Sequence, residues 1–151
     1  MYIQILSRSM TNKLPTKTIT MENIEEIYEY IFAPYVKQLK LSFLEIEEGR
    51  VVGKLENSKD YQFVTGAVSG QVLMSVIDTT MSIAMNTSVK SQRGTLSQNN
   101  NFIRPAFGDY FIIESIVQRF GRSIAIGETK VYQEDDKEKI ICHATSTFPL
   151  K

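Results

Sequence analysis

One acidic side chain stands alone in a long uncharged stretch of this sequence. Between Tyr61 and Val89, the only side chain charged at neutral pH is Asp78. A carboxylate among apolar residues is costly to bury, so it is hydrogen-bonded, neutralised by a raised pKa, or open to a solvated cleft. The last two cases describe a functional site, and an ionised carboxylate in an open cleft can take a proton from water or attack an electrophile itself. A purely structural Asp78, satisfied by backbone amides or by Ser75 and Ser82, is the alternative.

The residues around Asp78 predict one buried helix over positions 69–87. Its apolar residues cover most of the helix circumference, at positions 72, 73, 76, 77, 81, 83, 84 and 85. Its polar residues follow at steps of three or four and form one narrow stripe: Gln71, Ser75, Asp78, Ser82 and Asn86. Ser69 is a suitable N-cap. The run is too short and too polar for a membrane span, which needs roughly 20 apolar residues, so we expect no membrane partner.

The composition indicates a single domain that does not bind nucleic acid. The chain has 151 residues, enough for a substantial core, and its 17 basic and 17 acidic residues give no net charge. The single cysteine, Cys142, excludes an internal disulfide and fits a cytoplasmic location. Cys142 and the single histidine, His143, lie in a strand-like run, where we expect structural roles and no metal site.

The first 21 residues differ from the rest of the chain. They carry Arg8, Lys13 and Lys17 and no acidic residue. We expect a flexible extension over residues 1–21, with an organellar transit segment as the alternative. The folded domain then spans residues 22–151 and begins with a helix over 22–32, which Pro34 ends.

Extended runs flank the central helix. Residues 41–47 and 51–56 surround a turn at Glu48-Gly49-Arg50 and predict a hairpin. After the helix, four runs are separated by turn residues, at 95–103, 110–120, 123–133 and 140–148. A bent antiparallel sheet wrapped around one apolar helix buries that helix on nearly all sides. The sequence therefore predicts an α+β protein of the hot-dog architecture.

Four ordered motifs resemble the PaaI-like acyl-CoA thioesterases of the hot-dog superfamily. The segment SGQVLMSVIDTT (69–80) stands where that family has HGG, an apolar stretch and a DTA-like acidic motif. The segment TLSQNNNFIRPA (95–106) is similar to a strand ending in NFLRPA, and FGRSIAIGETKV (120–131) to a GR turn with its following strand. The C-terminal segment HATSTFPL (143–150) is similar to the family's last strand. The resemblance implies an acyl-CoA thioesterase, whose only cofactor-like group is the coenzyme A of its substrate.

The chain departs from the family pattern at three positions. Ser69 replaces the family's histidine, Gln71 its second glycine, and Phe63 an asparagine. A subgroup with SGP or SGQ at this site also resembles the chain, including its FAPYVKQLKL segment (32–41). A non-catalytic acyl-thioester binding protein is one alternative function, and a purely structural or interaction protein is another.

The resemblance assigns roles to individual residues. Asp78 corresponds to the catalytic nucleophile or general base, and Thr95 to a hydroxyl that holds the attacking water. The Gly70 amide, at the positive end of the helix, corresponds to the group that polarises the thioester carbonyl. Gly70 and Asp78 are eight residues apart, hence about 12 Å along a helix axis, and cannot both touch one carbonyl. The site then needs a homodimer with helices side by side in opposite directions, which can pair further into a dimer of dimers.

The remaining expectations concern substrate binding. Ser69, Gln71, Phe63 and Ser82 are expected near the substrate. Three cations are candidates for the phosphates of coenzyme A: Lys90, Arg104 and Arg122. Four further residues suggest an apolar pocket for the acyl chain: Phe63, Met74, Met81 and Met85.

Overall fold

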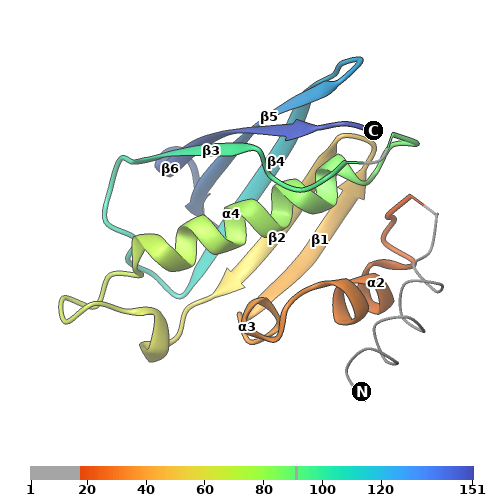
Figure 1. Ribbon diagram of the computed structural model, residues 1–151. Coiled ribbons are helices and arrows are strands. Elements are labelled where there is room, and N and C mark those ends of the chain that lie inside the picture. Colours follow the sequence, from red (N-terminus) through yellow and green to blue (C-terminus); the bar gives the residue numbers. More distant parts are fainter. Residues whose placement is uncertain (1–17, 91) are drawn as a thin grey trace, which may run out of the picture.

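The computed structural model describes residues 18–90 and 92–151. Six antiparallel strands form one bent sheet in the order β1-β2-β4-β5-β6-β3 (Figure 1). Their bounds are β1 Leu41–Glu47, β2 Arg50–Glu56, β3 Ser97–Phe102, β4 Tyr110–Phe120, β5 Ile124–Gln133 and β6 Asp136–Pro149. The predicted α+β hot-dog architecture is confirmed.

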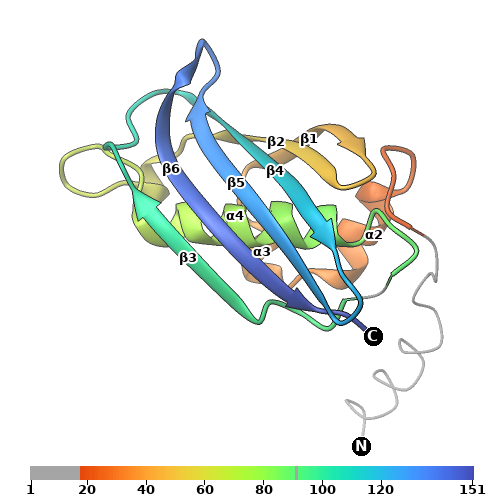
Figure 2. The same ribbon diagram turned by 90° about the horizontal axis from the view of Figure 1, so that it is seen from above.

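The long helix α4, Gly70–Met85, lies along the concave face of the sheet (Figures 1 and 2). Ten of its sixteen residues are buried, and Val76, Ile77 and Met81 are completely inaccessible to solvent. The predicted polar stripe forms its least buried face: Gln71 is exposed, while Ser75, Asp78, Ser82 and Asn86 are intermediate. Helical periodicity thus turns one row of polar side chains away from the sheet.

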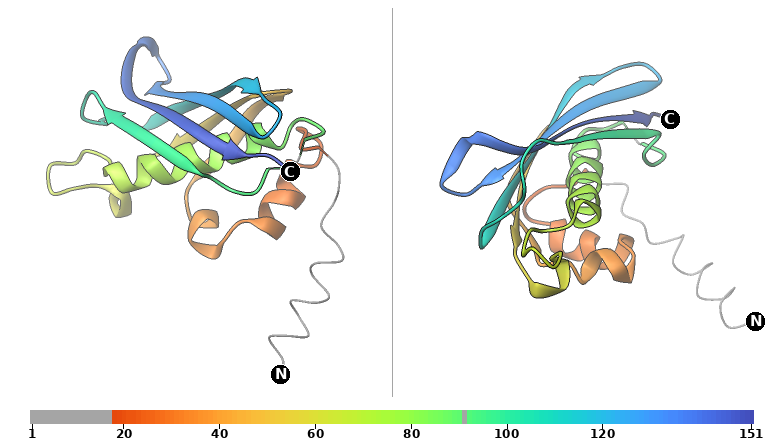
Figure 3. Two further views of the ribbon diagram at one scale, coloured as in Figure 1. Left: turned by 45° about the horizontal axis from the view of Figure 1, so that its top comes forward. Right: turned by 90° about the vertical axis from the view of Figure 1, so that its left-hand side faces the viewer.

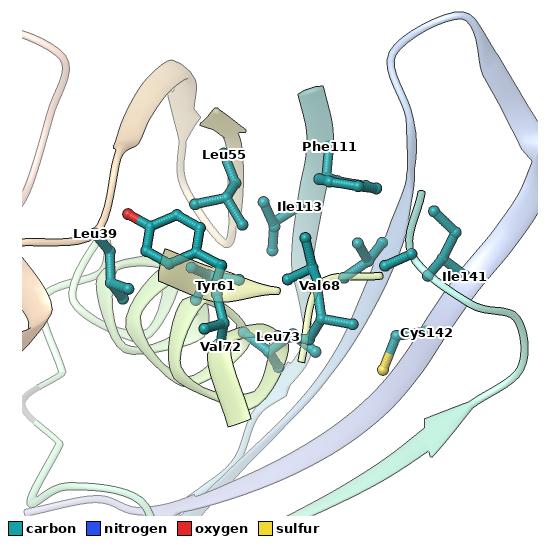
Figure 4. Packing of buried hydrophobic residues seen from close by; sticks show 14 of the residues in the cluster. Leu39, Leu55, Tyr61, Val68, Val72, Leu73, Phe111, Ile113, Ile141 and Cys142 are labelled. Atoms are coloured by element: carbon teal, nitrogen blue, oxygen red, sulfur yellow. The ribbon is translucent and has the colours of Figure 1, made fainter. Parts of the chain in front are cut away.

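Two hydrophobic clusters hold α4 against the sheet. The first surrounds the N-terminal half of the helix and includes Leu55, Phe111 and Ile113 from the strands (Figure 4). The second surrounds the C-terminal half and includes Met81, Met85 and Phe148. Burial of these side chains contributes about 25 cal/mol per Å² of apolar surface removed from water. This free energy holds α4 against the sheet.

The N-terminal part of the domain packs at the edge of the sheet formed by β1. Here α2, Ile24–Ile31, is followed by the short helix α3, Pro34–Lys37 (Figure 3). The predicted helix over 22–32 is thus confirmed with tighter bounds, and Pro34 begins α3 at a position where a missing N–H costs nothing. Of the predicted extension over residues 1–21, residues 1–17 lie outside the described residues. Ile19 is buried, and its N–H donates to the Asn86 carbonyl at 2.9 Å.

Two strands differ from the predicted runs by more than one residue at an end. The run predicted over 95–103 shortens to β3, and the run predicted over 140–148 lengthens to β6, which begins at Asp136. The charged residues 136–139 therefore belong to β6 and not to the hairpin tip, and Asp136 pairs with Gln133 at the end of β5. Within the described residues, no helix is both long and apolar enough to cross a membrane.

Candidate active site

Asp78 and Thr95 meet in an open cleft between α4 and the start of β3. The Thr95 hydroxyl donates a hydrogen bond to Asp78 Oδ1 at 2.5 Å. Asp78 is the third of the five residues in the polar stripe of α4, and it is only partly buried. This bond occupies one carboxylate oxygen and leaves the other free to accept a proton.

The cleft around Asp78 is polar. Its volume is about 470 Å³, and six of its seven lining residues are polar: Gln71, Met74, Ser75, Asp78, Thr95, Gln98 and Asn100. The cleft is open, so water can enter it and hydrogen-bond to these polar side chains. Asp78 is thus only partly buried, and the Ser75 hydroxyl donates to the Gln71 carbonyl.

The helix begins with two unpaired backbone donors. Ser69 is the N-cap, as predicted, and its hydroxyl accepts a hydrogen bond from the Val72 N–H at 3.4 Å. The N–H groups of Gly70 and Gln71 find no acceptor in the part of the chain that the structure describes. They point out of the positive end of the helix dipole, where a developing negative charge is stabilised.

An apolar groove opens at this end of α4. It has a volume of about 640 Å³. Its walls include Phe63, Met74, Phe102 and Ile103, whose side chains are all at least 37% exposed. Four exposed apolar side chains around one groove are typical of a surface that a ligand or a partner covers.

Gly70 lies under the ring of Phe102 in this groove. A Cβ added at Gly70 would lie 3.2 Å from the ring, closer than ordinary van der Waals contact. Glycine therefore allows Phe102 to pack closely against the first turn of α4, and a larger residue would require the ring to shift.

The three candidate cations fall into two places. The Lys90 ammonium donates to the Gly121 carbonyl at 2.5 Å, which places it beside the turn that carries Arg122, near the C-terminal end of α4. Arg104 lines the apolar groove at the N-terminal end, and its guanidinium donates to the Ile140 carbonyl at 2.6 Å. One chain does not bring the three cations together.

Other predicted site residues are distributed as follows. Phe63 lines the groove, and Gln71 lines both the groove and the polar cleft. Ser82 lies on the exposed stripe but lines neither of them. The expectation that Met81 and Met85 form the acyl pocket is wrong: both are fully buried, because these helix positions face the sheet and the N-terminal segment.

Three residues near the site escaped the sequence analysis. Phe102 forms one wall of the groove, and Gln98 and Asn100 form the floor of the polar cleft. In a strand with the sequence SQNNNF, no alternation of apolar and polar residues indicates which side faces the helix. The sequence did offer one indication that these residues lie near the site, because the strand begins two residues after Thr95.

Cys142 and His143 lie away from the chemistry. Cys142 is in the core, and burial raises the pKa of its thiol to about 11, so it stays protonated at neutral pH. His143 Nε2 lies 3.4 Å from Glu128 Oε1 and has no contact with Asp78. The described residues contain no group of side chains suited to hold a metal ion.

Similar proteins are named as thioesterases or esterases. The family described as the thioesterase superfamily matches residues 65–140. A Saccharolobus solfataricus protein that is provisionally named an esterase is 27% identical over 115 residues, covering 76% of this chain and 81% of that protein. The PaaI protein of the E. coli phenylacetic acid degradation operon superposes with a TM-score of 0.76 and 17% identity, over 86% of this chain and 91% of that one. A Streptococcus pneumoniae protein, solved as a thioesterase with coenzyme A, gives a TM-score of 0.68 and 16% identity, over 74% and 85%.

Proposed function

The chain belongs to the thioesterase superfamily and is a thioester hydrolase, and on this premise we propose that it hydrolyses an acyl-CoA to a free acid and coenzyme A. The observation that carries the proposal is the Asp78 carboxylate in an open polar cleft, held by the Thr95 hydroxyl. The coenzyme A in the structurally similar S. pneumoniae protein supports the choice of thiol.

Asp78 supplies the base or the nucleophile. As a base, its free oxygen takes a proton from water while the water oxygen attacks the thioester carbon. The carbonyl oxygen becomes an oxyanion, the C–S bond then breaks, and the departing thiolate takes the proton back from Asp78. As a nucleophile, Asp78 attacks the same carbon and forms an anhydride that water then cleaves. Both routes need a donor for the oxyanion.

The unpaired Gly70 N–H is that donor, and it comes from a second copy of the chain. Gly70 and Asp78 lie at the first and ninth positions of α4, about 12 Å apart along its axis. Two α4 helices that pack side by side in opposite directions place Gly70 of each copy beside Asp78 of the other. Met74, midway between them, then lies at the centre of the dimer.

The surface of the chain suits this pairing. The polar stripe of α4 lines one cleft together with residues of β3. In the described part of the chain, β3 is the last strand at its side of the sheet and pairs only with β6 (Figure 2). Two copies that bring their stripes together also bring their two β3 edges together, and unpaired edge strands are ready to form a continuous sheet. The exposed groove residues Phe63 and Phe102 become covered in such a dimer.

The dimer also brings the candidate cations together. The N-terminal end of one α4, with Arg104, approaches the C-terminal end of the other, with Lys90 and Arg122. Three positive side chains then lie on one side of the reacting carbonyl. They are suited to bind the phosphates of coenzyme A.

The Asp78→Asn variant tests the catalytic assignment. It keeps the shape and most hydrogen bonds of Asp78 but cannot act as a base or nucleophile. We expect a folded dimer that binds acyl-CoA and loses roughly a hundredfold or more in turnover, the loss usual for a positioned base. Hydrolysis and calorimetric binding are measured on the same preparation, with Asp135→Asn in the exposed β5–β6 turn as the matched control.

Two outcomes would contradict the proposal. Wild-type turnover in Asp78→Asn would remove Asp78 from the mechanism. Binding of acyl-CoA without turnover in the wild type as well would favour an acyl-thioester binding protein.

A further inference from the structure

The inner face of β3 is polar where a strand facing a buried helix is usually apolar. Gln98 and Asn100 lie opposite Ser146 and Ala144 of β6. Residues directly opposite each other in an antiparallel pair share one face of the sheet, and Ser146 and Ala144 are buried on the helix side. Gln98 and Asn100 therefore face α4.

Hydrogen bonds hold these two amides in fixed orientations. Gln98 Nε2 donates to the Met74 carbonyl at 3.2 Å and to Asn100 Oδ1 at 3.0 Å. The acceptor end of the Asn100 amide is thereby occupied. Its donor end, Nδ2, has no acceptor among the residues that the structure describes, and it lies in the cleft that contains Asp78.

The hydrogen-bonding capacity of this region is not used up by the protein. In the described part of the chain, the buried polar side-chain atoms without a partner are Gln98 Oε1 and Ser146 Oγ. Deeper in the same face of the sheet, by contrast, the hydroxyls of Ser115 and Thr129 satisfy each other at 2.7 Å. Buried polar groups are nearly always paired, so unpaired ones indicate a bound water or ligand.

The position of Asn100 identifies which part of the substrate it faces. β3 starts near Asp78 and runs toward the N-terminal end of the same chain's α4. Gln98 of β3 lies beside Met74 of the helix, and Phe102 at the end of β3 lies beside Gly70. In the proposed dimer this direction leads to the centre, away from Lys90, Arg122 and the partner copy's groove. The coenzyme A arm extends toward the cations, so the acyl arm lies against Gln98 and Asn100.

We propose that the substrate is a short acyl thioester with a hydroxyl or carbonyl oxygen at position 2 or 3 of its acyl group, and that the Asn100 amide donates a hydrogen bond to this oxygen. The inference rests on the proposed thioesterase function and names its substrate class. Asn100 is the specificity residue, and Gln98 is a positioning residue that orients it. The acyl group is short because two acyl arms, one from each site, approach the dimer centre at Met74.

Pairs of acyl-CoAs that differ only by hydroxyl against methyl test the proposal. Lactoyl-CoA is compared with isobutyryl-CoA, and 3-hydroxybutyryl-CoA with isovaleryl-CoA. We expect the wild type to favour the hydroxyl member of at least one pair by roughly tenfold or more in kcat/KM, because a site that donates to a substrate oxygen rejects the analogue without it. Asn100→Leu should abolish that ratio, and Gln98→Met should reduce it.

A matched control and three results complete the test. Asn101→Leu makes the same change one residue along, on the outer face opposite His143, and should leave the ratio unchanged. Equal losses for all four substrates in Asn100→Leu would show that the amide acts on the thioester or on coenzyme A, and would overturn the inference. A wild type that hydrolyses all four without preference would also overturn it. A wild type that hydrolyses none of the four but cleaves a long-chain or aromatic acyl-CoA would overturn the inference alone, whereas hydrolysis of no acyl-CoA at all would remove the proposed function.

Discussion

At the residue scale, the local features of the site were predictable and the distant ones were not. The Ser69 cap and the polar stripe follow from spacing within one helix, so the sequence was sufficient for both. Met81 and Met85 were misplaced, because an almost wholly apolar helix does not indicate which of its apolar faces meets the sheet. Gln98 and Asn100 were missed for a related reason: their direction depends on pairing with β6.

A Ser69 variant tests whether this residue has a structural role or a chemical one. Its hydroxyl caps α4, so Ser69→Ala should lower the free energy of unfolding by about 1 kcal/mol and leave the turnover number nearly unchanged. Urea denaturation and steady-state hydrolysis measure the two effects. A loss of about a hundredfold in turnover at unchanged stability would show instead that the hydroxyl takes part in the reaction.

Thr95 offers a matched pair of variants. Thr95→Val removes the donor to Asp78 Oδ1 and keeps the volume of the side chain, whereas Thr95→Ser keeps the donor. We expect a loss of roughly tenfold or more in turnover for Thr95→Val and near wild-type turnover for Thr95→Ser. Equal activities in the two variants would mean that the hydroxyl does not orient the carboxylate.

At the element scale, α4 can approach the sheet closely because β5 has a glycine under it. A Cβ added at Gly127 would lie 2.5 Å from the sulfur of Met81 and 3.2 Å from the Ile116 carbonyl. The motif around Gly127 was recognised in the sequence, but its partner on the helix is 46 positions away and could not be identified there.

Gly127→Ala should therefore destabilise the domain. Overpacking of a fully buried methionine costs about 1–3 kcal/mol, and Met81→Ala alone leaves a cavity that costs about 2–5 kcal/mol. The double variant should lose clearly less than the sum of the two single losses, because each change relieves the other. Chemical denaturation of the wild type, the two single variants and the double variant gives the coupling free energy between positions 127 and 81. Additive losses would show that the two positions are not in contact.

At the scale of the whole molecule, the proposed site exists only between two chains. Light scattering at micromolar concentration should give a dimer or a larger assembly, and an active monomer would contradict the proposal. The exposed isoleucines of the outer sheet face, Ile116, Ile124 and Ile126, are where a dimer of dimers would pack.

The order of strands in the sheet also determines when the reactive cleft can form during synthesis. β3 precedes three other strands in the sequence, yet among the described residues it pairs only with β6, the last of them. A growing chain on the ribosome therefore carries Asp78 and Thr95 long before β3 has anything to pair with. β3 can therefore take its place beside α4 only after β6 has left the ribosome, so this wall of the cleft is the last part of the sheet to form.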